Sequence, residues 1–435
     1  MSTPRKNKPA SHEWVNSTPE GWTETRLRFV ANVSNSNVDK KSYDGQVPVR
    51  LCNYTDVYYN ERIEPELEFM QATATPAEIK KFELREGDVI ITKDSEDPTD
   101  IGVPALVPKD MPGVVCGYHL SVIRTSDPIT AAFLQYSIMS HVNKAQLYVD
   151  TPGVTRFGLD QDAIKSILVL LPPPEERRQI VEMLRKETGR IDGLIEKKTR
   201  FISVLNDKEK AMIAHFVRRG IDASASTKDS GIEWRGVVPA HWQRARMKNH
   251  FKQVKRQGFD DLTVLSVYRE FGVIEKASRS DNINKTPEDL SKYQLVEPND
   301  LAINKMKAWQ GSMGISPFLG ITSPDYVVMK PIGEHNPRYM HHYLRARPMP
   351  WVYRLISNGI RTDQWRMEPE KFLELPIFLP PMDEQEAIAN RIDRELDRIR
   401  GLIEKTEHSI ALLKEKRAAL ITAAVTGKID VRSAA

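Results

Sequence analysis

Three short segments of this chain combine side chains that are suited to contact nucleic acid. Residues 304–311 read NKMKAWQG, residues 357–366 read SNGIRTDQWR, and residues 152–158 read PGVTRFG. Lysine and arginine neutralise phosphates, and arginine and amide side chains hydrogen-bond base edges. The candidate contact residues are Lys93, Thr155, Arg156, Lys305, Lys307, Trp309, Gln310, Arg361, Gln364 and Arg366. Each cation could also be a solvated surface charge, and Trp309 and Trp365 could belong to a core.

The distribution of charge favours the same chemistry in the second half of the chain. The 435 residues carry 63 Lys and Arg against 59 Asp and Glu, a net charge of only +4. Residues 1–174 have a net charge of −5, whereas residues 223–382 have a net charge of +6. The small overall value therefore hides a basic segment that could attract a polyanion.

The sequence contains no pattern that predicts covalent chemistry. It has no phosphate-binding GxxxxGK[ST] loop, no methyltransferase motif and no ordered nuclease carboxylates after the acidic run 94–97. Cys52 and Cys116 have no partners at ligand spacing, and the scattered histidines, His341–His342 included, are more typical of structural positions. We expect no catalytic residue, no metal and no bound cofactor. The two isolated cysteines favour a reducing cytoplasm, and since no apolar run reaches the roughly 20 residues of a membrane span, we expect neither export nor a transmembrane helix.

An internal repeat organises the chain. Residues 171–222 and 379–430 match at 21 of 52 positions without a gap, including GLIEK in both copies. Residues 87–93 resemble 299–305, and the segments before them share an ordered set of residues: Trp14, Pro19, Trp22 and Arg26 correspond to Trp234, Pro239, Trp242 and Arg246. A tandem duplication therefore predicts two similar domains, each followed by a similar segment.

Each repeated segment is predicted to be one helix of about 44 residues, or about 66 Å. Prolines and acids open both segments, and apolar residues recur at heptad spacing. A buried bundle helix or an oligomerising coiled coil would fit, but two matching stripes in one chain favour packing of the copies on each other. The residues expected to pack are Leu184, Ile191, Leu194, Leu205, Met212, Ile392, Ile399, Leu402, Leu413 and Leu420.

The regions before the helices have mixed character and predict an α+β fold. Short strand-like runs and helical stretches alternate with glycine and proline, and the run ASASTKDS at 223–230 is typical of a linker. The predicted organisation is a first domain over 1–171, a long helix in 172–222, a second domain over 223–378 and a second long helix in 379–435.

Together these residues resemble the specificity subunits of type I restriction-modification enzymes. The resemblance rests on the two Leu-Pro-Pro helix starts, the GLIEK cores, the GKID close at 427–430 and the GIEW to PAHW run at 231–242. The segments 304–311 and 323–326 also resemble one class of target recognition domain. The first copy departs from the family pattern at Arg177–Arg178, where the second has Gln385–Glu386.

The resemblance implies a non-catalytic bacterial or archaeal subunit with two α/β target recognition domains and two long helices paired as an antiparallel coiled coil, related by an internal pseudo-two-fold repeat. Each domain would read one half of a bipartite, asymmetric site in double-stranded DNA. Two methyltransferase subunits and restriction subunits would bind to it and would carry S-adenosylmethionine, ATP and Mg²⁺. A coiled-coil adaptor for protein partners remains the alternative, followed by an enzyme with an unrecognised site.

Overall fold

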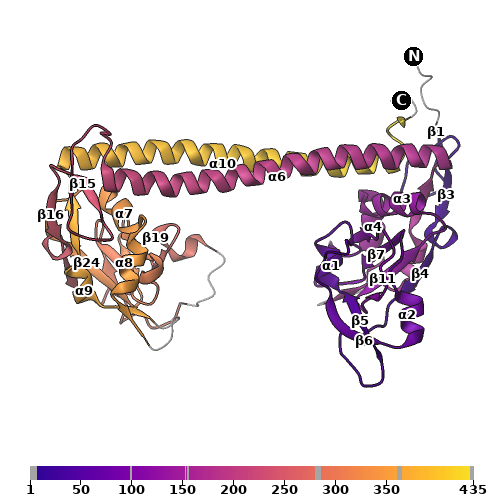
Figure 1. Ribbon diagram of the computed structural model, residues 1–435, viewed down its shortest axis with the longest axis horizontal. Coiled ribbons are helices and arrows are strands. Elements are labelled where there is room, and N and C mark those ends of the chain that lie inside the picture. Colours follow the sequence, from indigo (N-terminus) through magenta and orange to yellow (C-terminus); the bar gives the residue numbers. More distant parts are fainter. Residues whose placement is uncertain are drawn as a thin grey trace, which may run out of the picture. The chain divides into compact units, whose positions relative to one another are not determined.

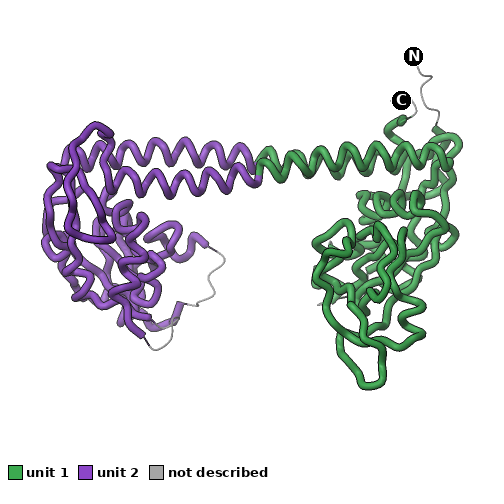
Figure 2. Tube along the Cα trace, in the orientation of Figure 1, with its two compact units in different colours: residues 1–198, 408–435 green, residues 199–407 purple. Residues whose placement is uncertain are grey.

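The computed structural model describes residues 7–97, 100–151, 153, 156–279, 286–359 and 365–431 (Figure 1). The chain divides into two compact units (Figure 2). Unit 1 comprises residues 1–198 and 408–435, and unit 2 comprises residues 199–407. Each of the two long helices therefore contributes one part to each unit.

Unit 1 is built on a four-stranded antiparallel sheet with the order β4-β11-β7-β9. Alternate residues of the central strand β7 face two cores, as the period of a strand requires. Val89 and Ile91 face a core that includes α3, whereas Ile90 faces a second core shared with the sheet β10-β5-β6. The strands and helices of this unit before its long helix are β1 Asn7–Pro9, β2 Ser17–Pro19, β3 Thr23–Arg26, β4 Asn32–Asn35, β5 Val47–Cys52, α1 Tyr54–Tyr58, β6 Met70–Ala74, α2 Pro76–Phe82, β7 Asp88–Thr92, β8 Asp94–Ser95, β9 Pro104–Leu106, β10 Val114–Cys116, β11 Leu120–Arg124, α3 Pro128–Met139, α4 His141–Val149, β12 Phe157–Gly158, α5 Gln161–Ser166 and β13 Leu168–Leu171.

Unit 2 repeats this plan with the sheet order β17-β24-β21-β22, again antiparallel. Leu301 and Ile303 of β21 face the large core with α7 and α8, whereas Ala302 faces a much smaller cluster beside β18 and β19. The elements before its second long helix are β14 Thr227–Asp229, β15 Val237–Pro239, β16 Gln243–Arg246, β17 Phe251–Val254, β18 Leu265–Tyr268, β19 Gly272–Glu275, β20 Gln294–Val296, β21 Leu301–Asn304, β22 Met313–Ile315, β23 Gly320–Thr322, β24 Tyr326–Pro331, α7 Pro337–Arg345, α8 Met349–Leu355, β25 Ser357–Asn358, β26 Arg366–Met367, α9 Pro369–Leu373 and β27 Pro376–Leu379. The predicted duplication of an α+β fold is confirmed.

A buried tryptophan ties the start of each domain to the helix that follows it. Trp22 donates Nε1–H to Glu176 Oε2 at 3.0 Å, and Trp242 donates to Glu384 Oε1 at 3.2 Å. Both carboxylates lie in the first turn of a long helix, where the helix dipole favours negative charge. The tryptophans that the repeat singled out thus occupy equivalent structural positions.

The long helices are α6 (Pro174–Arg219) and α10 (Met382–Val425). In unit 1, Leu184 near the start of α6 shares a core with Ile421 near the end of α10. In unit 2, Val217 near the end of α6 shares a core with Ile388 near the start of α10. The two helices are therefore antiparallel in each unit, as predicted.

The residues predicted to pack between the helices differ in their burial. Five are almost fully buried: Leu184, Ile191, Leu205, Ile392 and Ile399. Met212, Leu413 and Leu420 are partly buried. By contrast, Leu194 and Leu402 are 41% and 39% exposed, so they lie outside the buried stripe. Each follows a buried isoleucine by three residues, which places it about 60° farther round the helix.

Neither long helix is apolar enough to cross a membrane, and the same holds for the other helices in the described part of the chain.

Candidate nucleic-acid interface

In each unit, a backbone hydrogen bond joins one segment that the sequence singled out to the residue that directly follows another. Leu159 donates its backbone N–H to Lys93 O at 2.7 Å in unit 1, and Met367 donates to Lys305 O at 3.1 Å in unit 2. Lys93 directly follows β7, and Lys305 directly follows β21, the equivalent central strand. The segment that ends β7 or β21 therefore meets the segment that precedes α5 or α9.

In unit 2, this junction holds an aromatic and basic cluster. After Lys305 the chain forms a short 3-10 helix, Ala308–Gln310, and Trp309 donates Nε1–H to Met306 O at 3.1 Å. The ring of Trp309 meets that of Trp365 edge-on, with centroids 6.0 Å apart. Both tryptophans are partly exposed, so neither belongs to the buried core.

Three further cations line the same cluster. The guanidinium of Arg354, on α8, lies 5.1 Å from the centre of the Trp365 ring, a favourable cation–π distance. Arg366 Nε lies 3.0 Å from Met306 Sδ, and Lys307 is exposed. Gln310 is partly buried at the end of the 3-10 helix. This arrangement offers positive charge beside aromatic surface, which is suited to a polyanion that also carries flat rings.

The turn after the 3-10 helix requires glycine. Gly311 has φ = 93°, in the left-handed region, and a Cβ atom there would lie 3.2 Å from Pro350 Cγ. This close approach holds the 3-10 helix against α8.

The equivalent place in unit 1 has different chemistry. Lys93 Nζ donates to Ser36 O at 3.4 Å, and the exposed Arg156 reaches within 3.4 Å of His119 Nδ1. The same imidazole nitrogen lies 2.7 Å from Asp94 Oδ2. A carboxylate thus stands among the cations here, which agrees with the acidic character of the first domain.

Sequence reasoning missed a group of tyrosines on α1, which meets the carboxylate of Asp100. Tyr54 and Tyr58 of α1 stack at 5.4 Å, and Tyr58 Oη donates a hydrogen bond to Asp100, which raises the pKa of Tyr58 to about 12. Tyr59 follows them and is 75% exposed. The spacing of Tyr54 and Tyr58, one helical turn apart, is the signal that could have revealed the group.

Three of the candidate contact residues cannot be placed, because Thr155, Arg361 and Gln364 lie outside the described residues. The structure thus brings together Lys93 with Arg156 in unit 1, and Lys305, Lys307, Trp309, Gln310 and Arg366 in unit 2. Their contact with DNA stays a prediction.

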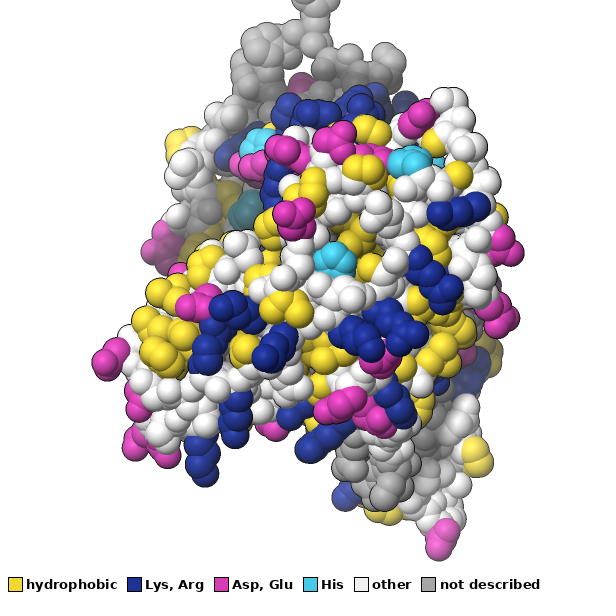
Figure 3. Space-filling view, turned by 90° about the vertical axis from the view of Figure 1, so that its left-hand side faces the viewer, with side chains coloured by type: hydrophobic (Ala, Val, Ile, Leu, Met, Phe, Trp, Pro, Cys, Tyr) yellow, Lys and Arg dark blue, Asp and Glu magenta, His cyan; other side chains and the backbone are white. Residues whose placement is uncertain are grey.

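Part of the basic charge of unit 2 is neutralised within the protein. Figure 3 shows one face of this unit, where Lys and Arg side chains gather in groups among acidic and apolar ones. Glu374 binds both Arg246 and Lys248, with 2.7 Å between its Oε1 and Lys248 Nζ. Hydrogen bonding to Lys248 contributes most to lowering the pKa of Glu374. Net charge alone therefore does not identify the cations that are free to bind phosphate.

The two cysteines are poorly placed for chemistry. Both are fully buried, and desolvation raises the pKa of both thiols. Within the described ranges, no three His, Cys, Asp or Glu side chains are grouped so that they could hold a metal ion.

Comparison with known proteins shows which family this chain is similar to. Residues 19–200 match the model of the type I restriction modification DNA specificity domain. Over 423 residues, and 95% of each chain, the sequence is 22% identical to the putative type I restriction enzyme MjaX specificity subunit of Methanocaldococcus jannaschii. Residues 19–200 thus form a type I specificity domain, and nearly the whole chain resembles type I specificity subunits. Specificity subunits are non-catalytic, so this chain is not itself an enzyme.

Further similarities extend over most of the chain. It is 24% identical over 378 residues to the MjaVIII specificity subunit of the same organism, covering 81% of this chain and 82% of the relative. A chain solved in work on complex assembly and conformational transition of the type I restriction-modification system shares the fold, with a TM-score of 0.68, 17% identity, and coverage of 95% of this chain and 99% of that one. The HsdS subunit from Thermoanaerobacter tengcongensis has a TM-score of 0.52 at 18% identity, over 95% and 98% of the two chains.

Proposed function

We propose that this chain reads a bipartite, asymmetric site in double-stranded DNA. Residues 1–171 and 223–378 act as the two target recognition domains, and each reads one half-site. One observation carries this proposal: equivalent backbone hydrogen bonds, Leu159 to Lys93 and Met367 to Lys305, form the same junction in both units. The side chains at the two junctions differ.

The asymmetry follows from the residues at these junctions. Lys93 is followed by Asp94, whereas Lys305 is followed by Met306 and Lys307. Lysine and arginine pair with the O6 and N7 acceptors of guanine, whereas a carboxylate accepts from the amino group of cytosine. Two domains with such different side chains would recognise different bases, so the site would not be palindromic.

The long helices serve as the scaffold for assembly, within residues 172–222 and 379–435. Apolar side chains stay exposed on both of them: Phe201 and Val204 on α6 are 45% and 56% exposed, and Leu412 on α10 is 52% exposed. Exposed apolar residues of this size are typical of surfaces that a partner covers. Two methyltransferase subunits, with S-adenosylmethionine, and restriction subunits, with ATP and Mg²⁺, are the proposed partners in a bacterial or archaeal cytoplasm.

The experiment is to purify the chain with a DNA adenine methyltransferase of its host and to map methylated adenines in the host genome. We expect a stable complex and a methylated motif of two different half-sites separated by a fixed spacer. The motif should disappear when this gene is deleted. A complex that forms without any such motif would favour the coiled-coil adaptor instead.

A further inference from the structure

The helix α8 of unit 2 exposes an apolar and basic ridge that the sequence did not predict. Trp351 is 55% exposed and Leu355 is 61% exposed, although both are large apolar residues. Arg354 is exposed between them. Residues at this spacing share one face of a helix, so the three side chains form a single surface, the α8 ridge. The buried residues Val352 and Tyr353 hold the opposite face in the core.

The α8 ridge directly adjoins the candidate nucleic-acid interface. Arg354 lies over the ring of Trp365, which in turn meets Trp309 at 6.0 Å. Pro350, at the start of the same helix, approaches Gly311 at the end of the 3-10 helix. A molecule that contacts Trp309 and Lys307 would therefore meet the ridge as the next surface.

Unit 1 has a similar feature at the equivalent place. There α4 follows α3 and packs against it, as α8 follows α7 and packs against it. Tyr148 and Val149, at the end of α4, are 50% and 64% exposed. Both domains thus expose apolar side chains on the second helix of this pair, but the residues differ. This is what a surface that reads a different ligand in each domain would require.

We infer that the α8 ridge is a second DNA-contacting element of unit 2. This inference rests on the proposed function and extends it to residues outside the segments 304–311 and 357–366. Trp351 and Leu355 pack against bases or deoxyribose, and Arg354 binds a neighbouring phosphate. Apolar side chains that pack on or between bases are an established way for proteins to grip DNA.

The charge around the ridge favours DNA over an apolar protein partner. Among the described residues, Arg354, Lys307 and Arg366 form no ion pair with a carboxylate, in contrast to Arg246 and Lys248 of the same unit. Cations left available around exposed aromatic rings match the phosphates and flat bases of nucleic acid.

The test uses the complex of the full chain with its methyltransferase subunits and a duplex that carries the methylated motif. Trp351→Ala and Leu355→Ala should each weaken binding, the former by about tenfold. Base substitutions in the half-site read by unit 2 should then reduce the affinity of these variant complexes less than they reduce the affinity of the unaltered complex. Base substitutions in the other half-site should reduce the affinity of the variant and unaltered complexes equally. Trp351→Phe, which keeps an aromatic ring, should restore most of the affinity.

A matched control is Ile332→Ala. Ile332 is 56% exposed, as exposed as Trp351, but it follows the end of β24 that lies away from the junction, since Asn304 pairs with Tyr326 at the opposite end. Its replacement should leave DNA binding unchanged.

Two outcomes would overturn the inference. Equal affinities of the Trp351→Ala and unaltered complexes would show that the ridge does not contact DNA. Loss of the methyltransferase subunits from the Trp351→Ala complex would show that the ridge binds protein. The proposed function fails separately, and visibly, if the unaltered complex shows no preference for any motif.

Discussion

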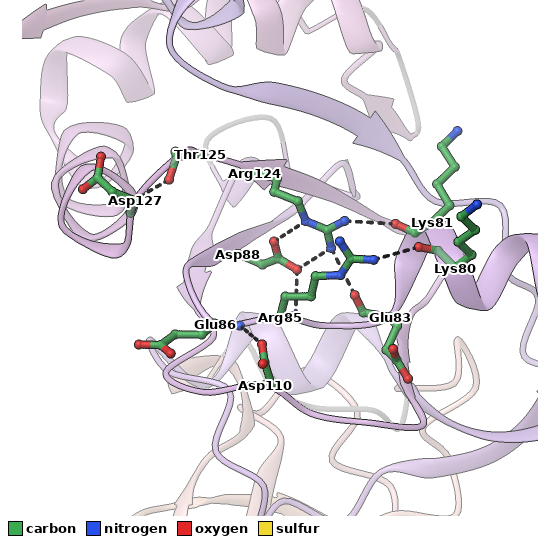
Figure 4. Close-up of polar contacts among 10 residues, drawn as sticks. All are labelled: Lys80, Lys81, Glu83, Arg85, Glu86, Asp88, Asp110, Arg124, Thr125 and Asp127. Atoms are coloured by element: carbon green, nitrogen blue, oxygen red, sulfur yellow. Dashed lines mark hydrogen bonds and ion pairs between the residues drawn. The ribbon is translucent and has the colours of Figure 1, made fainter.

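Arg124 holds the buried carboxylate of Asp88 in a two-pronged ion pair, with Nε 2.6 Å from Oδ1 and Nη2 2.7 Å from Oδ2 (Figure 4). The Asp88 side chain is only 1% exposed, and it also accepts the backbone N–H of Arg85 at 2.9 Å. The hydrogen bond to Asp88 is the main reason that the pKa of Arg124 is raised. This pair fixes the turn that leads into β7, the strand that Lys93 directly follows.

Replacement of Arg124 should therefore destabilise unit 1. Arg124→Ala leaves a buried carboxylate without its cation, and we expect a loss of about 3 kcal/mol in the free energy of unfolding, measured by urea denaturation. Arg85→Ala is the control, because the Arg85 guanidinium donates to Lys80 O near the surface and its backbone N–H stays in place. Similar losses for the two variants would contradict the importance of the buried pair.

Unit 2 has the same carboxylate with an arginine from a different strand. Asp300 directly precedes β21 and accepts the backbone N–H of Glu297 at 2.8 Å, but its ion pair is with Arg256, just after β17. Both units thus have a buried carboxylate at this turn, but its cation comes from β11, the direct neighbour of β7, in unit 1, and from the segment after β17, two strands away from β21, in unit 2.

The contact between tryptophan and glutamate at each helix start should contribute measurably to stability. Glu384 accepts from Trp242 Nε1 and lies 2.7 Å from His241 Nε2. Glu384→Gln should lower the free energy of unfolding by about 1–3 kcal/mol. Glu386→Gln, at an exposed position two residues on, should have almost no effect. Thermal unfolding of both variants checks this, and equal melting temperatures would argue against the contact.

Acid should destabilise unit 2 through its buried imidazoles. Burial lowers the pKa of His335 to about 4, and it also lowers the pKa of the neighbouring His250. Because the unfolded chain binds a proton near the ordinary histidine pKa of about 6.5, stability is complete above that pH and falls as the pH drops towards 4. The loss attributable to His335 should be about 2 kcal/mol. His335→Asn should flatten the dependence of melting temperature on pH between 6.5 and 4, and an unaltered slope would rule out this residue as the cause.

Salt dependence can separate phosphate contacts from base contacts in the complex. If Lys307 binds a phosphate, Lys307→Ala should reduce the slope of log affinity against log salt by about 1 and weaken all duplexes alike. Arg156→Ala should act on the other half-site, because it lies in unit 1. Lys371→Ala serves as control, since Lys371 is paired with Glu368 at 3.0 Å. An unchanged slope for Lys307→Ala would exclude Lys307 from the phosphate contacts.

Local patterns predicted much of the fold. Heptad spacing identified α6 and α10, the family resemblance implied their antiparallel pairing, and the repeat matched β7 to β21 and Trp22 to Trp242. The burial of single positions was harder to predict, as exposed Leu194 and Leu402 show, because a stripe on a straight helix drifts relative to a strict heptad.

The candidate site was only partly visible in the sequence. The segments that meet at Lys93 and Lys305 stood out by composition, but their hydrogen bonds join residues more than 60 positions apart. The contact of His119 with Asp94 and the packing of α8 on the 3-10 helix likewise depend on strand register and chain reversal, which composition does not encode.

The pairing that closes each domain has a consequence for its evolution. Leu27 donates its backbone N–H to Ile167 O at 2.9 Å, and Met247 donates to Leu375 O at 3.0 Å, just beyond the paired strands β3–β13 and β16–β27. Each strand pair, with the long helix that follows it, forms a frame. The chain leaves this frame and rejoins it at neighbouring points. Everything between can be lengthened, shortened or exchanged as a cassette without displacing the start of the long helix. The second copy is 12 residues shorter than the first over this region, which shows that the frame accepts such changes.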